Sequence, residues 1–119
     1  MITVTVRRTL DGWITRFTAS GHSGYAEAGS DIICAAVSAM AAEAIGSLQE
    51  LACIDPERQL ETGLIDFQLP EPSTITEQQR QVAGVLTDAL VIGCKQIQDS
   101  YGSHYIRFKK SVSKGGAKA

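Results

Sequence analysis

The chain has 119 residues, of which 44% are hydrophobic and 20% charged, a size and balance that fit one domain around one core. These values exclude a wholly disordered chain, because disordered chains carry too few apolar residues to bury. The net charge of −2 excludes a chain that attracts nucleic acid through its overall charge, and we expect no direct nucleic-acid binding.

The first residues predict a β-hairpin and no export signal. Ile2, Val4 and Val6 alternate with polar residues, which is the period of a strand with one buried face. A turn signal at residues 10–12 precedes a second β-rich run, so the hairpin covers residues 2–19. The start lacks the apolar stretch of a signal peptide, and no apolar run approaches the roughly 20 residues of a membrane span. We therefore expect a cytoplasmic protein with no membrane partner.

A glycine-rich loop and a long helix follow the hairpin. Residues 20–30 contain three glycines and predict a loop. Ser30 or Asp31 can cap the helix expected over about residues 32–52, because a short side-chain oxygen can accept the unpaired amides of the first turn. Steps of three and four place one apolar face on this helix: Ile33, Val37, Met40, Ala44, Leu48 and Leu51.

The second half repeats the order of strand, strand and helix. Residues 58–61 and 64–69 predict a hairpin that turns near Thr62 and Gly63. Thr76 is the expected cap of a helix over residues 77–101, and Gly102 is its expected stop. The predicted apolar stripe of this helix is Val82, Val85, Leu86, Ala89, Leu90, Gly93 and Ile97. A last strand is expected over residues 104–110.

The resulting order, ββαββαβ, predicts an α/β two-layer domain of the α+β type. In this fold class one mostly antiparallel sheet is covered by two long helices. We assign residues 1–110 to a single domain. Residues 111–119 form a basic, disordered tail in this interpretation, because no acidic residue follows Asp99 while several lysines do.

The chain has three cysteines, Cys34, Cys53 and Cys94. An odd number in a chain that we expect in the cytoplasm argues against a disulfide framework. There is no C-x-x-C pair, and His22 and His104 lie far apart in the sequence. We therefore expect no zinc site, no other metal and no cofactor.

Cys34 and His22 are the candidates for chemistry. Cys34 lies in the first turn of the predicted helix, where unpaired amides and the helix dipole favour a thiolate. The same amides could hold the oxyanion formed when a carbonyl is attacked. His22 can act as the base if its loop folds back over the helix start. On spacing alone, packing in the core is the more common role for such a cysteine, because most cysteines in helices are buried and unreactive.

Four more residues belong to the predicted site in supporting or loop roles. Gly21 and Gly29 allow turns around His22 and before the helix. Asp31 fits a helix cap best, with a supporting role in the site as the alternative. Ser38 lies one turn after Cys34 on the same helix face. Its side chain could form a hydrogen bond to the loop or to a substrate, and simple close packing is the alternative role.

The segment GHSGYAEAGSDIICAAVSAM, residues 21–40, resembles the signature of the ribosomal-processing cysteine proteases, the Prp family. The family pattern is Gly-His, followed by Gly-x-Asp-Ile-(Val or Ile)-Cys-Ala-(Ala)-Val-Ser. This sequence has Gly21 and His22, and then the run from Gly29 to Ser38. The chain length and the predicted element order also suit the family, whereas the basic tail lies outside the signature.

The resemblance implies a cytoplasmic bacterial endopeptidase that removes a short N-terminal extension from a large-subunit ribosomal protein. It also implies a homodimer and a catalytic dyad of His22 and Cys34. Two other functions stay open on the residues alone. One is a non-enzymatic, ribosome-associated binding module that uses the basic C-terminal end, and the other is a thiol hydrolase with a small substrate.

Overall fold

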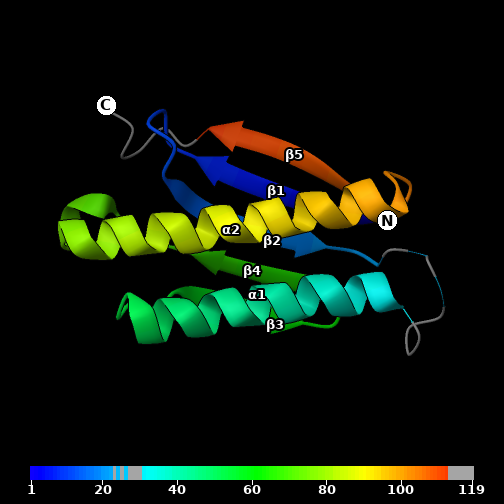
Figure 1. Cartoon of the computed structure of the whole chain (residues 1–119), viewed down its shortest axis with the longest axis horizontal. Helices are drawn as coiled ribbons and strands as arrows, with labels where there is room; N and C mark the ends of the chain where they lie inside the picture. Colours follow the sequence, from blue (N-terminus) through cyan, green and yellow to red (C-terminus); the bar gives the residue numbers. More distant parts are fainter. Residues whose placement is uncertain (23, 25, 27–30, 113–119) are drawn as a thin grey trace.

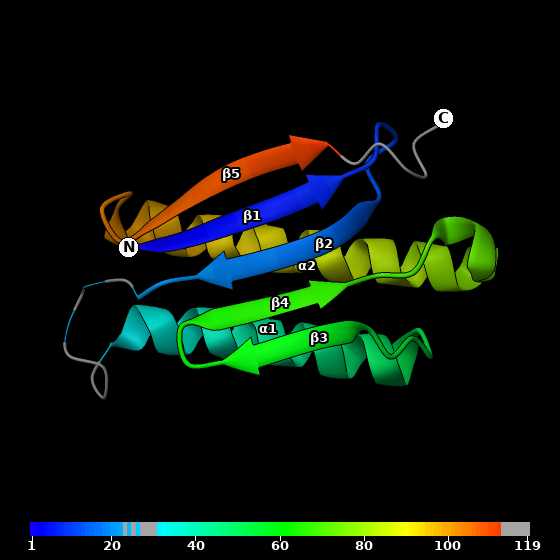
Figure 2. The same cartoon turned by 180° about the vertical axis from the view of Figure 1, so that it is seen from behind.

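The computed structural model describes residues 1–22, 24, 26 and 31–112. Five strands form one sheet, and two long helices lie side by side over one face of it (Figure 1). Seen from behind, the other face of the sheet is left open (Figure 2). The two-layer α+β class expected from the element order is confirmed.

The sheet has the order β3-β4-β2-β1-β5. The N-terminal hairpin of β1 (Ile2–Arg8) and β2 (Ile14–Ser20) forms its centre. β3 (Glu57–Glu61) and β4 (Leu64–Gln68) continue it antiparallel on one side. β5 (Ile106–Val112) pairs parallel with β1 on the other side, so the sheet is mixed. β5 begins and ends two residues later than predicted, which brings Ser111 and Val112 into the sheet.

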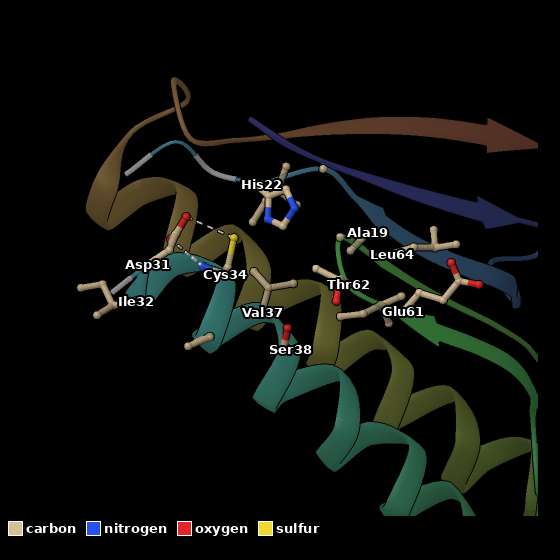
Figure 3. A pocket seen from close by; sticks show the side chains of 15 residues that line it. Ala19, His22, Asp31, Ile32, Cys34, Val37, Ser38, Glu61, Thr62 and Leu64 are labelled. Atoms are coloured by element: carbon tan, nitrogen blue, oxygen red, sulfur yellow. Dashed lines mark hydrogen bonds between the residues drawn. The ribbon is translucent and has the colours of Figure 1, made fainter. Parts of the chain in front are cut away.

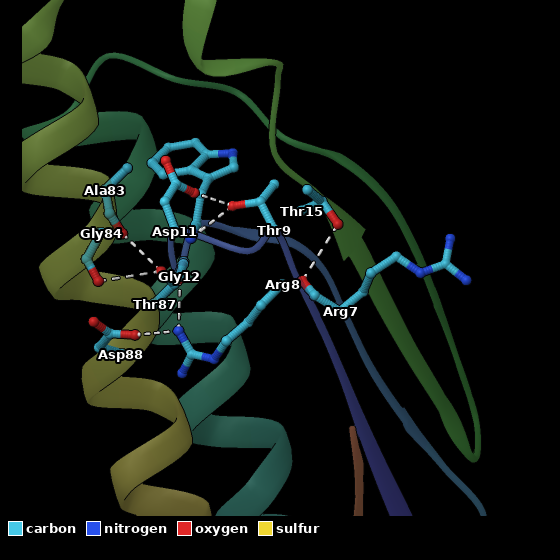
Figure 4. Close-up of polar contacts among 11 residues, drawn as sticks. Arg7, Arg8, Thr9, Asp11, Gly12, Thr15, Ala83, Gly84, Thr87 and Asp88 are labelled. Atoms are coloured by element: carbon cyan, nitrogen blue, oxygen red, sulfur yellow. Dashed lines mark hydrogen bonds and ion pairs between the residues drawn. The ribbon is translucent and has the colours of Figure 1, made fainter. Parts of the chain in front are cut away.

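The β1–β2 turn is tied to the second helix by a charged side chain. Arg8 Nη1 donates to the carbonyl of Gly12 at 2.8 Å and to Asp88 Oδ1 at 2.9 Å (Figure 4). The register of the β1–β2 pair shifts between Arg7 and Arg8, so the regular strand pairing is interrupted next to this turn. These contacts lie at the end of the sheet opposite to the residues of the predicted site.

The first helix, α1 (Ile32–Leu51), follows the predicted bounds closely. Its buried residues are Ile33, Val37, Ala41, Ala44, Ile45 and Leu48. The predicted face is therefore right at four of six positions. Met40 is only partly buried and Leu51 is 65% exposed. Small residues such as Ala41 and Ala44 take the inner positions because the helix lies close against its neighbours.

By length and composition alone, α1 could cross a membrane, contrary to our expectation that no apolar run is long enough. In the folded chain its apolar face packs against the sheet and against α2. The core helix of a globular domain passes the same test of length and composition, so this finding carries no membrane assignment.

The second helix, α2 (Glu77–Tyr101), has the predicted bounds but a different buried face. Thr76 and Gln79 form a capping box, and Gly102 follows the last turn with φ +103°. The buried residues are Ala83, Thr87, Leu90, Val91 and Cys94. The predicted stripe was wrong at Val85, which is 68% exposed, and at Ala89.

The error at Val85 arose because the prediction assigned large apolar residues to the buried face of α2. The innermost positions of α2 are held by Ala83, Thr87 and Cys94, which are small enough for close packing. Thr87 can be buried because its hydroxyl donates to the carbonyl of Ala83 at 2.9 Å.

Candidate active site

The start of α1 is organised by the buried side chain of Asp31. Its Oδ1 accepts the amides of Ile33 at 3.1 Å and Cys34 at 3.0 Å, so Asp31 is the helix N-cap, as expected. Its Oδ2 accepts a hydrogen bond from Cys34 Sγ at 3.2 Å. Asp31 is only 5% exposed, while Cys34 is half-buried. One carboxylate therefore holds both the backbone and the thiol of Cys34.

The expected oxyanion site at the first turn is not open in this arrangement. The amides of Ile33 and Cys34 donate to Asp31 Oδ1, and the amide of Ala35 donates to the backbone carbonyl of Asp31. The prediction was therefore wrong for these three amides. A good N-cap satisfies the amides that the sequence pattern leaves unpaired.

His22 reaches the site from the end of β2. The amide of Gly21 donates to the carbonyl of Gly63 at 2.8 Å, which joins the end of β2 to the β3–β4 turn. Gly21 has φ +95°, and a Cβ at this position would lie 2.5 Å from the carbonyl oxygen of Met1. Only glycine therefore fits the position before His22.

His22, Cys34 and Ser38 line one cavity of about 380 Å³. In Figure 3 the side chains of His22 and Cys34 project toward the same space, and a ring nitrogen of His22 lies on the side of the Cys34 sulfur. Ser38 lies one turn further along α1 and is exposed. The fold thus brings together the cysteine, the histidine and the serine that the sequence singled out.

The β3–β4 turn supplies pocket residues that sequence reasoning missed. Glu61, Thr62, Gly63 and Leu64 line the cavity opposite α1. The sequence marked this segment only as a turn, because nothing local connects it with residues forty positions earlier. Gly29, predicted as a loop residue of the site, lies outside the described residues.

The two remaining cysteines lie in other surroundings. Cys94 is fully buried in α2, and this burial raises the pKa of its thiol to about 12. Cys53 is exposed beyond the C-terminal end of α1, the end opposite to Cys34. Within the described part of the chain, no three side chains of the metal-binding types gather at one place.

A cysteine and a histidine in one cleft provide a nucleophile and a base for attack on a carbonyl. The sequence profile of the family described as cysteine protease Prp matches residues 1–107. This chain belongs to that family. It is a cysteine protease, and the resemblance of residues 21–40 is confirmed.

A curated relative and several solved structures agree with this assignment. The ribosomal processing cysteine protease Prp of Bacillus subtilis is 31% identical over 103 residues, 85% of this chain and 90% of the relative. A crystal structure of Prp from Staphylococcus aureus with a covalently linked product peptide superposes with a TM-score of 0.80 at 21% identity. The superposition covers 93% of this chain and 100% of the S. aureus chain, which shows that the two proteins share a fold.

A protein from Streptococcus mutans of known structure has the same fold at 26% identity. The TM-score is 0.76, and the match covers 95% of this chain and 96% of that chain. The members of this group therefore keep one backbone arrangement while most side chains differ.

Proposed function

We propose that this protein removes the N-terminal extension of a large-subunit ribosomal protein during ribosome maturation in the cytoplasm. The B. subtilis relative, a ribosomal processing cysteine protease, supports this substrate class, since the match covers 90% of its length. The structural observation that carries the proposal is the shared pocket of His22 and Cys34.

Cys34 is the nucleophile and His22 the general base in the proposed mechanism. His22 takes the thiol proton as Sγ turns from Asp31 and bonds to the carbonyl carbon of the scissile peptide. The C–N bond then breaks, and the new amine leaves with the proton from the imidazolium. His22 then takes a proton from water, and the resulting hydroxide bonds to the thioester carbon. The C–S bond breaks, the imidazolium returns its proton to the Cys34 sulfur, and the released carboxylic acid loses its proton to the solvent.

The lining of the pocket suits a peptide from a basic protein. Its charged side chains are the carboxylates of Asp31 and Glu61, with neither lysine nor arginine among the described lining residues. Ribosomal proteins are basic because they bind RNA phosphates. A second hollow continues the cleft along Ser38, Ala42 and Leu60, which leaves room for an extended chain beside α1.

We further propose a homodimer, as in the family that the sequence resembles. Val85 and Ile92 lie two helical turns apart on one side of α2 and are 68% and 57% exposed. Such apolar exposure fits an interface between two copies of the chain. Sedimentation equilibrium of the wild type and of Val85→Lys/Ile92→Lys tests this, with a monomeric double variant as the expected result.

The decisive experiment is cleavage of a peptide that spans the extension and the mature start of the ribosomal protein. Mass spectrometry should find one internal cut for the wild type, none for Cys34→Ala and almost none for Cys34→Ser, since a hydroxyl ionises far less readily than a thiol. His22→Ala should lose at least about a hundredfold in rate. Near-normal turnover in any of these variants contradicts the dyad. Binding without cleavage by the wild type would instead favour the ribosome-associated binding module.

A further inference from the structure

The turn between β3 and β4 touches the segment that carries His22. Gly63 lies in this turn and has φ +78°, a backbone conformation that residues other than glycine rarely adopt. Its carbonyl accepts the amide of Gly21, the residue before His22, at 2.8 Å. The turn therefore holds the backbone from which the imidazole projects.

The imidazole ring itself also lies next to Gly63. A Cβ built on Gly63 would lie 3.0 Å from His22 Nε2, 3.6 Å from Cε1 and 3.7 Å from Cδ2. The first distance is shorter than the usual contact between carbon and nitrogen. The ring thus occupies the space that a side chain at position 63 would need.

The orientation of His22 depends on such packing. The imidazole is exposed, and within the described ranges we find no hydrogen bond from either ring nitrogen. A side chain without a hydrogen bond can change between rotamers unless its packing neighbours favour one of them. Gly63 can hold the ring in place, because its carbonyl accepts the hydrogen bond from the Gly21 amide and the imidazole lies next to it.

We propose that Gly63 is a positioning residue for the catalytic base, holding His22 over the pocket that contains Cys34. The inference rests on the proposed role of His22 as the base. Because a base must lie within hydrogen-bond reach of the proton that it takes, a small displacement of the ring lowers the rate.

The matched test compares Gly63→Ala with Gly12→Ala. Gly12 also lies in a hairpin turn and has φ +97°, but a Cβ there meets nothing within 4 Å. Both variants carry the same kind of backbone strain, and only Gly63→Ala adds an atom against His22. We expect kcat for the peptide to fall about 10- to 100-fold in Gly63→Ala with little change in KM, and less than about twofold in Gly12→Ala.

A second readout needs no peptide. The pH profile of Cys34 alkylation by iodoacetamide, followed by mass spectrometry of the Cys34 peptide, reports the influence of the base on the thiol. Gly63→Ala should move the profile toward that of His22→Ala, and Gly12→Ala should keep the wild-type profile. In the wild type, nuclear Overhauser contacts should join the His22 ring protons to the Gly63 α-protons, which tests the contact even if Gly63→Ala does not fold.

Two results would overturn the inference while leaving the proposed function intact. One is a Gly63→Ala protein that behaves like Gly12→Ala in both readouts. The other is a rise in KM alone with an unchanged alkylation profile, which would make Gly63 a peptide contact. Normal cleavage by His22→Ala would instead remove His22 from the proposed mechanism, and the positioning role with it, whereas the absence of cleavage by the wild type would overturn the proposed function itself.

Discussion

Asp31 serves two neighbours at the start of α1. As the N-cap it accepts two amides, and through its other oxygen it accepts the Cys34 thiol. The capping part stabilises the helix, whereas the thiol contact keeps the sulfur at a defined place in the resting site. Substitutions that keep a cap and remove the carboxylate can separate the two roles.

Asp31→Ala should lower the free energy of unfolding by about 1 kcal/mol, since alanine cannot accept the first-turn amides. Asp31→Ser keeps a capping oxygen and should lose only a fraction of this. Urea unfolding of both variants measures the difference. We expect either variant to lose less cleavage activity than His22→Ala. A fully inactive but stable Asp31→Ser protein would show that the carboxylate acts in the chemistry.

Cys94 should resist alkylation in the folded protein. Its pKa of about 12 leaves almost no thiolate near pH 8, and its side chain is fully buried. Iodoacetamide labelling followed by mass spectrometry should mark Cys34 and the exposed Cys53 and spare Cys94 until denaturant is added. Labelling of Cys94 at the same rate as Cys53 would show that α2 opens readily.

At the scale of elements, a charged cluster on the open sheet face joins β2 to β4. Arg16 donates to both oxygens of Asp66 at 2.8 and 2.7 Å, and Thr18 Oγ1 donates to Oδ1 at 3.1 Å. The hydrogen bond from Arg16, the main cause, holds the pKa of the Asp66 carboxyl below its usual value. The cluster thereby couples the strand that leads to His22 with the hairpin that lines the pocket.

Asp66→Asn should therefore lower the free energy of unfolding at pH 7 by about 1–2 kcal/mol, a value reduced because Arg16 is half-exposed. A carboxyl with a lowered folded pKa contributes stability above its unfolded pKa and loses it as the pH falls through the folded value. The gap between wild type and variant should thus shrink below about pH 4. Urea unfolding at several pH values measures this.

The exposed pair of Asp55 and Arg58 provides the control. Asp55→Asn should change stability less than Asp66→Asn does, because exposed pairs are screened by water. A gap between wild type and Asp66→Asn that does not vary with pH would contradict the role of the carboxyl charge.

At the scale of the whole molecule, the first and the last strand of the described chain pair with each other. β5 pairs with β1 over seven positions, and Ile106 is fully buried between the sheet and the helices. The amide of Ile2 donates to the carbonyl of Tyr105 at 2.8 Å. The carbonyl of Met1, next to this bond, borders Gly21 in the site. β5 thus supports the start of β1, and the segment that carries His22 lies beside the start of β1.

A chain shortened to residues 1–105 should lose its cooperative unfolding transition and its cleavage activity. It lacks β5 and leaves the edge of β1 and part of the core exposed. A chain of residues 1–112 keeps all of β5 and is the control, with an expected Tm within a few degrees of the full chain. Thermal unfolding followed by circular dichroism compares them. A cooperative transition in the 1–105 chain would show that β5 is dispensable for the fold.

The sequence by itself determined the order and the approximate bounds of the elements. Caps and apolar periods act between residues a few positions apart, which is why Thr76, Asp31 and Gly102 marked helix ends correctly. The family signature around His22 and Cys34 was also recognisable, because its residues lie in one short continuous segment, residues 21–40.

Only the tertiary structure decided which helix faces turn inward and which distant segments meet. The buried face of α2 follows close packing against two partners, so small residues such as Ala83 and Cys94 displace larger ones such as Val85. The contact of Gly63 with His22 exists because β4 pairs with β2 in a register that brings the β3–β4 turn beside the end of β2. Pairing of strands so far apart in sequence depends on the whole topology, and no local pattern contains it.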